Sequence, residues 1–251
     1  MTVSSELRIR ALPGLGELQP GDDLAAVILQ ALAAARWTIM PETVFVVAQK
    51  IVSKVEGRVV ALDSVEPSPL ARRWAEACGK DPRLVELVLQ QSRRIVRMAA
   101  GVLIAETHHG FICANAGVDS SNAPPGCAIL LPADPDASAE RLRQRLRAAL
   151  GVPLGVIISD SFGRPWREGQ VNVALGVAGV APLRDYRGLQ DPFGRRLQAS
   201  VIATADELAA AAELVMGKIE RRPVALIEGL QLGEPGTARQ LLRRPEQDLF
   251  R

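Results

Sequence analysis

The chain has 251 residues, of which 48% are hydrophobic and 23% charged, and this composition excludes a disordered or fibrous protein. Its 30 basic and 28 acidic residues give a net charge of +2, which is too balanced to indicate nucleic-acid binding, and an aromatic content of 4% argues against a base-stacking surface. The three cysteines form no CxxC pair, no apolar run is long enough to span a membrane, and the first residues lack a secretory hydrophobic segment. We therefore expect a soluble, cytoplasmic protein with free thiols.

Helical spacing predicts three helices in the first hundred residues. The first covers 24–36, where the acidic pair at 22–23 precedes the apolar pattern as an N-cap signal. Between residues 67 and 98 the helical pattern occurs twice, and Pro82 stands near the start of the second helix. The basic run RRIVR (93–97) falls in that second helix, so its arginines are expected on a solvated face, where an acidic substrate could also use them.

Strand signals are spread along the whole chain. Two short runs flank the turn His108-His109-Gly110, which predicts a β-hairpin. The runs that read as strands are 7–11, 43–48, 102–107, 111–116, 127–132, 155–159, 197–204 and 223–230.

The second half of the chain adds two helices. One is expected over 137–150 with Asp136 or Ser138 as N-cap, and another over 205–217, ended by Gly217. The small, apolar segment 171–180 fits either a close-packed strand or an interface. Because hairpins are mixed with helices, the order favours an α+β fold with a mixed or antiparallel sheet.

The stretch GVIISDSFGRPWREG (155–169) contains the first candidate site. A short buried strand runs into Asp160 and Ser161, which places a carboxylate and a hydroxyl where a sheet opens to solvent. Arg164 and Arg167 follow within the same stretch. Fixed negative charge beside mobile positive charge suits a divalent cation together with an anionic substrate, which the two arginines would bind.

A second acidic segment, NAGVDSSN (115–122), has two interpretations. Its Asn, Gly, Asp and Ser residues are all turn formers, so it could be an ordinary surface turn. Alternatively, Asp119 lies among amide and hydroxyl groups of the kind that hard cations prefer, and with Asp160 and Ser161 it would make an oxygen-only site for Mg²⁺ or Mn²⁺.

Other candidate groups are less specific. Lys50 and Lys54 lie four residues apart after a strand, where they are either solvated charges or partners for nucleotide phosphates. The chain contains no GxxxxGK[ST] motif, which excludes a P-loop, and its early glycines do not match GxGxxG. The adjacent histidines fit the hairpin turn better than a metal site, and Cys113 alternates in a strand pattern as a core residue.

Several long motifs occur in an order that resembles a known family. They are SKVEGR (53–58), NAGVDSSN (115–122), LLPADPDASAERLR (130–143), VIISDSFGRPWREG (156–169) and VMGK followed by PVALIEGL (215–230). In this order they resemble the coenzyme F420:L-glutamate ligases, and the resemblance runs from residues 21–24 to about Leu230.

This resemblance implies a GTP-dependent ligase of coenzyme F420 biosynthesis. Such an enzyme adds L-glutamate to the phospholactyl tail of coenzyme F420-0 and then adds γ-linked glutamates, with GTP activating the acceptor as an acyl phosphate. The family implies two Mg²⁺ or Mn²⁺ ions per site, K⁺ as a further ion, and an intertwined homodimer, for which the 171–180 segment would suit the interface. We expect 1–251 to form a single ligase unit, with two intertwined subdomains as a variant, and without the C-terminal nitroreductase-like domain of some bacterial relatives.

The family's site residues carry over by position. Asp119, Asp160 and Ser161 resemble its metal ligands. Lys218 stands where a carboxylate ligand of the second metal is expected, so Glu220 would have to supply that carboxylate. The positions that match GTP contacts are Pro13, Gly14, Leu15, Gly16, Gln49, Lys50, Lys54, Asn122, Gly217, Lys218 and Ile219.

Two rivals to this function stay open at the level of sequence. A related ligase could join an amino acid to a different phospho-acid acceptor, and a non-catalytic nucleotide-binding module could use the same glycines and lysines. The sequence identifies neither the general base nor the number of glutamates added.

Overall fold

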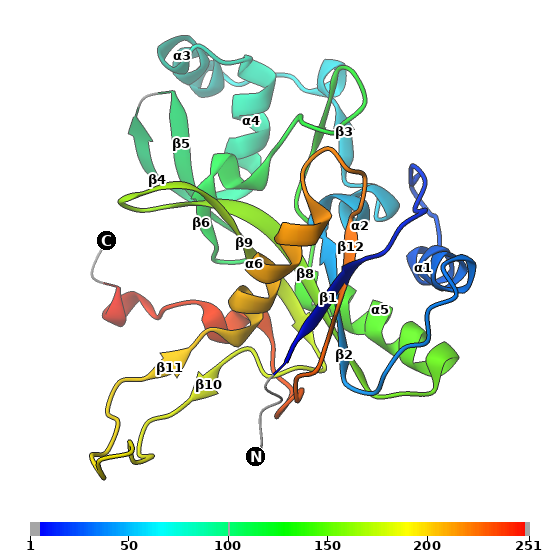
Figure 1. Cartoon of the computed structure of the whole chain (residues 1–251). Coiled ribbons are helices and arrows are strands. Elements are labelled where there is room, and N and C mark those ends of the chain that lie inside the picture. Colours follow the sequence, from blue (N-terminus) through cyan, green and yellow to red (C-terminus); the bar gives the residue numbers. More distant parts are fainter. Residues whose placement is uncertain (1–5, 100, 249–251) are drawn as a thin grey trace.

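The computed structural model describes residues 6–99 and 101–248, and a five-stranded sheet lies at its centre (Figure 1). Its strand order is β1-β12-β2-β8-β9, in which β2 and β8 are parallel and the other neighbours antiparallel. The strands are β1 (Arg8–Ala11), β2 (Thr43–Ala48), β8 (Leu154–Arg164), β9 (Arg167–Ala178) and β12 (Val224–Glu228). Near-continuous apolar runs such as TVFVVA in β2 are typical of strands that are covered on both faces.

Helices cover both faces of this sheet. Helices α1 (Leu24–Ala34) and α5 (Pro135–Leu150) pack on one face, and α6 (Thr204–Met216) packs on the other (Figure 1). Successive side chains of a strand point to opposite faces, so the neighbours Val156 and Ile157 belong to different apolar cores.

A second body packs beside the sheet and has its own apolar core. It contains a three-stranded antiparallel sheet, β4-β5-β6, and the two-stranded pair β3-β7. Its core includes Val85, Leu103 and Ala128. The chain enters this body after α2 (Gln49–Val55), whose Ile51 and Val52 pack in the core of the central sheet. The elements of the second body are β3 (Val59–Ala61), α3 (Pro69–Cys78), α4 (Pro82–Gln90), β4 (Ser92–Ala99), β5 (Val102–Thr107), β6 (Ile112–Ala114) and β7 (Cys127–Ile129).

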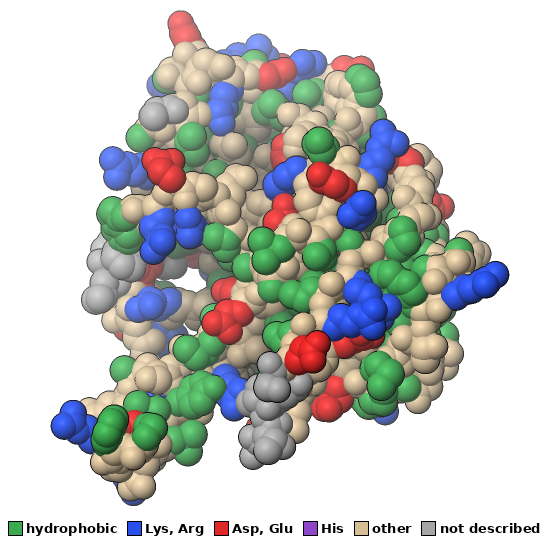
Figure 2. All heavy atoms as spheres, viewed as in Figure 1, with side chains coloured by type: hydrophobic (Ala, Val, Ile, Leu, Met, Phe, Trp, Pro, Cys, Tyr) green, Lys and Arg blue, Asp and Glu red, His purple; other side chains and the backbone are tan. Residues whose placement is uncertain are grey.

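A narrow arm projects from the molecule. It is built on the two short antiparallel strands β10 (Arg184–Asp185) and β11 (Val201–Ile202), and Figure 2 shows hydrophobic side chains on it. Over the rest of that face, acidic and basic side chains are interspersed, as the small net charge leads one to expect (Figure 2). Among the described residues, no helix combines the length and the apolar character needed to cross a membrane.

The structure confirms the α+β class with mixed and antiparallel sheets. It also confirms the strand over 43–48, the hairpin around His108-His109-Gly110 and the end of α6 at Gly217. The predicted unit 1–251 extends at both ends beyond the described residues. The burial of 171–178 within β9 accounts for its apolar composition, so the homodimer stays a prediction that rests on the family resemblance.

The prediction that the helix continues to residue 98 is wrong. Helix α4 ends at Gln90, and the basic run lies on strand β4. Arg93 and Arg94 both form ion pairs with Glu106, a buried residue on the neighbouring strand β5. Such cross-strand pairs, together with the β-branched residues at 95 and 96, favour a strand here. The spacing of apolar residues alone had predicted a continued helix.

Boundaries of other elements also differ from the sequence predictions. The N-cap of α5 is Asp134, whose carboxylate accepts a hydrogen bond from the Ala137 amide at 3.1 Å, because Pro135 occupies the first helical position. Strand β8 does not end before Asp160 but continues to Arg164. Strand β11 is shorter than the predicted run over 197–204.

The close approach of α5 to β9 gives a test of the fold. A Cβ at Gly176 would lie 2.2 Å from the Pro135 carbonyl oxygen, so Gly176→Ala is expected to lower the free energy of unfolding by about 1–3 kcal/mol. Urea denaturation measures the change. Gly163→Ala is the control, since nothing lies within 4 Å of its added Cβ. Equal destabilisation of the two variants would contradict the packing described.

Candidate active site

A cleft of about 980 Å³ opens between the central sheet and the second body. It is lined by residues from the 15–18 loop, the start of α2, the 113–122 segment, the β8–β9 hairpin and the end of α6 with the loop that follows it. Because β2 and β8 are parallel, their carboxyl ends meet at one edge of the sheet, which is where ligands bind in open sheets of this kind.

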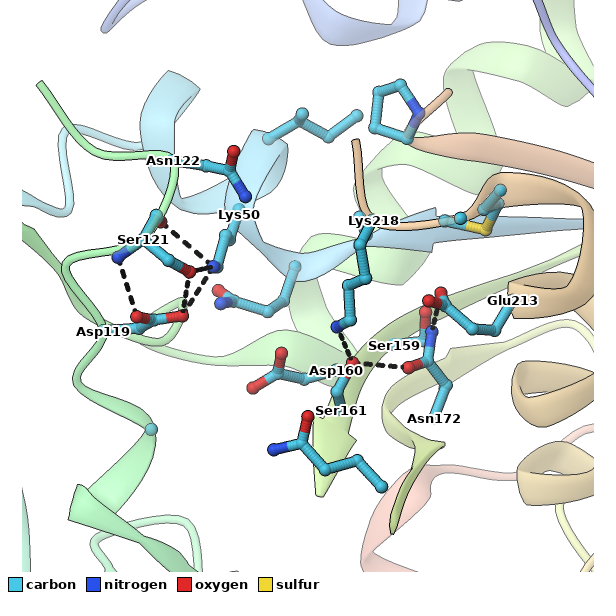
Figure 3. A pocket seen from close by; sticks show the side chains of 18 of the residues that line it. Lys50, Asp119, Ser121, Asn122, Ser159, Asp160, Ser161, Asn172, Glu213 and Lys218 are labelled. Atoms are coloured by element: carbon cyan, nitrogen blue, oxygen red, sulfur yellow. Dashed lines mark hydrogen bonds and ion pairs between the residues drawn. The ribbon is translucent and has the colours of Figure 1, made fainter. Parts of the chain in front are cut away.

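The unequal lengths of β2 and β8 place Asp160 in the cleft. Ala48, the last residue of β2, pairs with Ser159, and β8 then continues with β9 as its remaining neighbour. The chain leaves β2 directly into α2, so Lys50 comes to lie near Asp160 at the floor of the cleft (Figure 3). The Asp160 carboxylate and the Lys50 ammonium group therefore line the same cleft.

Asp119 reaches the cleft from the second body. Its backbone forms two hydrogen bonds with Ile129, which fix the segment beside β7. Lys50 Nζ donates to Asp119 Oδ2 at 2.5 Å and to Ser121 Oγ at 2.6 Å, and the Ser121 amide donates to Asp119 Oδ1 at 2.8 Å (Figure 3). Two groups that are 69 residues apart in sequence are thereby joined.

A second polar group lies on the α6 side of the cleft (Figure 3). Lys218 Nζ donates to Ser161 Oγ, and Ser161 Oγ donates to Asn172 Oδ1 at 2.7 Å. Asn172 Nδ2 in turn donates to Glu213 Oε2 at 3.0 Å. The chain of hydrogen bonds links the loop after α6, both strands of the hairpin and α6 itself.

The mouth of the cleft carries one further ion pair. Lys54 on α2 contacts the carboxylate of Glu17 in the 15–18 loop. The Lys54 side chain is largely buried, whereas that of Glu17 is 70% exposed. Leu15 and Leu18, on either side of Glu17, are buried in the core and anchor the loop.

The two aspartates have opposite pKa shifts. Burial raises the pKa of Asp160 to about 6, although the Ser161 amide, Lys50 and Lys218 oppose the change. Burial would also raise the pKa of Asp119, but the hydrogen bonds from Lys50 and Ser121 outweigh it and leave that pKa below its ordinary value. Near neutral pH both side chains are anionic, and Asp160 bears the larger desolvation cost.

The donor set fits a hard divalent cation. Asp119, Asp160 and Ser161 offer two carboxylates and a hydroxyl, and Mg²⁺ in nucleotide sites commonly takes one or two carboxylates with substrate phosphates and water. Within residues 6–99 and 101–248, no three His, Cys, Asp or Glu side chains converge on one cation position. Buried polar atoms of the same cleft, Ser159 Oγ and Gln49 Nε2, have no hydrogen-bond partner among the described residues.

The chain was compared with known proteins. Residues 14–229 match the family model for F420-0:Gamma-glutamyl ligase. The chain belongs to this family. It is 46% identical to the Coenzyme F420:L-glutamate ligase of Methanopyrus kandleri and 45% identical to that of Methanothermobacter thermautotrophicus, over 98% of both chains in each case. It is 43% identical to the Methanocaldococcus jannaschii ligase over 86% of this chain and 88% of the relative. The family resemblance inferred from the motifs is confirmed.

The fold brings most of the site residues predicted for an F420-0:gamma-glutamyl ligase into the cleft. Those that line it are Leu15, Gly16, Gln49, Lys50, Lys54, Asp119, Asn122, Asp160, Ser161, Gly217, Lys218 and Ile219.

Five predicted residues lie outside the cleft lining. Pro13 and Gly14 are exposed at the start of the 15–18 loop, and Arg164 and Arg167 lie at the exposed tip of the β8–β9 hairpin. The Glu220 carboxylate accepts a hydrogen bond from the Ile219 amide at 3.0 Å and thus turns back onto its own loop.

Sequence reasoning missed several polar residues of this ligase-family cleft. Glu213 lies four residues after Ala209 and three before Met216, both buried, so a charged residue on the apolar face of α6 was the available signal. Asn172, which is 5% exposed within a strand, is a similar signal. Ser121, Ser159 and Glu17 carried no pattern that distinguishes them from ordinary loop or strand residues.

The raised pKa of Asp160 predicts a pH-dependent stability effect. In chelator-treated protein, Asp160→Asn is expected to raise the free energy of unfolding at pH 8 by up to about 3 kcal/mol, since each of the roughly two pKa units between 3.8 and about 6 corresponds to about 1.4 kcal/mol. The protonated side chain of Asp160 is buried without charge, so the wild-type protein has its full free energy of unfolding below pH 4. Part of that free energy is lost as the pH rises through 6 and the buried carboxyl group ionises. The difference between the proteins should therefore vanish at pH 4.

Urea denaturation of both proteins between pH 4 and pH 8 measures this effect. Asp63→Asn, at an exposed position outside the cleft lining, is the matched control. A constant difference across the pH range would show that the Asp160 carboxylate is not desolvated in the folded state.

Proposed function

We propose that this chain is a GTP-dependent coenzyme F420-0:L-glutamate ligase that acts in coenzyme F420 biosynthesis. Its family and the names of relatives that match nearly its full length support the ligase class. The observation that carries the proposal is the convergence of Lys50, Asp119, Asp160 and Lys218 on one cleft from four separate parts of the fold.

The charges of the cleft match the charges of the proposed reactants. A nucleoside triphosphate, a phosphodiester acceptor and glutamate all carry negative charge, and phosphoryl transfer depends mainly on positioning and charge stabilisation. The basic side chains that line the cleft are Lys50, Lys54, Lys218, Arg221 and Arg222. They would hold these anions together against their mutual repulsion.

We further propose that Asp119, Asp160 and Ser161 hold Mg²⁺ or Mn²⁺. Such a cation would neutralise phosphate oxygens and polarise the phosphoryl group that is transferred. Lys50, which neutralises Asp119 in this structure, would then be released toward a phosphate, because an ammonium on a flexible stem can change partners within a short distance. K⁺ as a further ion and a homodimeric assembly are part of the same proposal.

The proposed reaction has two steps. The acceptor carboxylate first takes the γ-phosphoryl group of GTP, which gives an acyl phosphate and GDP. The amine of L-glutamate then attacks the acyl carbon, so that a C–N bond forms, the C–O bond to phosphate breaks and inorganic phosphate leaves. Further γ-linked glutamates would be added by repetition of these steps.

Phosphate release provides the test of this function. Wild-type protein with GTP and Mn²⁺ is expected to release phosphate only when coenzyme F420-0 and L-glutamate are both present, with the amide product identified by mass spectrometry. Asp160→Asn should reduce this turnover by at least about 100-fold, because the loss of a carboxylate ligand weakens the binding of the cation that would stabilise the transferred phosphoryl group. Asp63→Asn should keep wild-type turnover.

Each other outcome indicates a different protein. Turnover with another phospho-acid acceptor, and none with coenzyme F420-0, would identify a related ligase. Nucleotide binding without any amide product would identify a non-catalytic module. An Asp160→Asn variant with full turnover would refute the metal-binding role of this residue.

A further inference from the structure

The α6 side of the cleft contains a small polar pocket that none of the roles above uses. Its walls are Ser159 on β8, Asn172 on β9 and Glu213 on α6, and all three line the cleft. Figure 3 shows them grouped on the side of Asp160 that faces away from Asp119. The pocket is thus separate from the Asp119–Lys50 group.

Ser159 contributes an unpaired hydroxyl to this pocket. The residue is 1% exposed, and its Oγ has no hydrogen-bond partner among the described residues. Alternate residues of a strand share a face, so Ser159 lies on the same face of β8 as Ile157, which packs in the core beneath α6, and Ser161, which contacts Asn172. A buried hydroxyl without a partner is costly unless a ligand satisfies it.

Glu213 contributes a carboxylate that is fixed but only partly used. Its position on the sheet-facing side of α6 directs the side chain toward β9, where Oε2 accepts the hydrogen bond from Asn172. Oε1 accepts no hydrogen bond from any residue in the described part of the chain, and Glu213 forms no ion pair there. The nearest ammonium group of this network, on Lys218, is bound to Ser161 instead.

Asn172 fixes the orientation of the pocket. Its Oδ1 accepts from Ser161 and its Nδ2 donates to Glu213, so both ends of the amide are used and the amide cannot turn without losing both bonds. The carboxylate of Glu213 is therefore held in place before any ligand arrives. The pocket offers oxygen acceptors and one negative charge, and none of its three wall residues is cationic.

We propose that this pocket binds the α-ammonium group of the incoming L-glutamate, with Glu213 as its counter-ion and Ser159 as a hydrogen-bond acceptor. An ammonium group has one positive charge and three donors, two of which can bond the acceptors left free, Ser159 Oγ and Glu213 Oε1. Lys218 and Arg222 also line the cleft, and they would bind the two carboxylates of an acidic amino acid. The inference rests on the proposed ligase function and assigns the site of its amino-acid substrate.

A kinetic comparison tests the assignment. Compared with the wild type in the ligase reaction, Glu213→Gln should raise the KM for L-glutamate by at least tenfold and leave the KM for GTP unchanged. The reason is that a charge-assisted hydrogen bond is lost at one substrate alone. Ser159→Ala should raise the same KM by a smaller factor, about threefold. Glu207→Gln, on the exposed face of α6, should change neither constant.

Glutarate provides a readout that a structural role would not move. It has both carboxylates of glutamate but no amine, so its inhibition constant should be the same for wild type and Glu213→Gln. Equal weakening of glutarate and glutamate, or an increase in the KM for GTP, would overturn the assignment. A variant that changes the K⁺ dependence of turnover but not the KM for glutamate would place a metal ion in the pocket and would equally overturn it.

Direct binding separates this inference from the proposed function. Calorimetry of wild-type protein with a non-hydrolysable GTP analogue and Mn²⁺ should show L-glutamate binding at least tenfold more tightly than glutarate, a preference that Ser159→Ala reduces. This measurement needs neither turnover nor a stable Glu213 variant. If L-glutamate shows that preference but no amide product forms, the ligase function fails and the pocket assignment stands; equal affinity for the two compounds refutes the pocket.

Discussion

The parallel pairing of β2 with β8 is the constraint on which the cleft depends. Its register aligns Ala48 with Ser159, so one strand ends where the other continues. The chain that leaves β2 turns into α2 and supplies Lys50, while β8 supplies Asp160 one residue beyond the pairing. A shift of the register by one residue would turn Asp160 into an apolar core, because neighbouring strand residues point to opposite faces.

At this edge of the sheet, positive charges and hydrogen bonds offset part of the cost of burying the two aspartates. The Asp160 carboxylate has lost most of its hydration, and Lys50 and Lys218 offset part of the cost from two sides. Asp119 is better compensated, since Lys50 and Ser121 both donate to it. The ion pairs are formed by flexible ammonium groups, so they can separate when a cation and an anion enter together.

Local sequence determines much of the fold and of the site. Strand β2 follows from a run of apolar residues, and helix α6 follows from its helical spacing and from Gly217 at its end. Asp119 and Asp160 stand out because each follows a strand-like run. What sequence could not supply are the contacts between distant residues. The strand at 92–99 depends on Glu106 across a hairpin, and the role of Asn172 depends on a helix that begins more than thirty residues later. Local spacing contains neither relationship.

The tip of the loop that carries Glu17 is held more weakly than its two ends, which affects access to the cleft. Leu15 and Leu18 hold its two ends in the core, whereas the tip is fastened to Lys54 by one ion pair with an exposed partner. An ion pair of that kind contributes less than about 1 kcal/mol. Glu17 can therefore move away from Lys54 while Leu15 and Leu18 stay buried in the core. Added salt will weaken this ion pair without disturbing the apolar core.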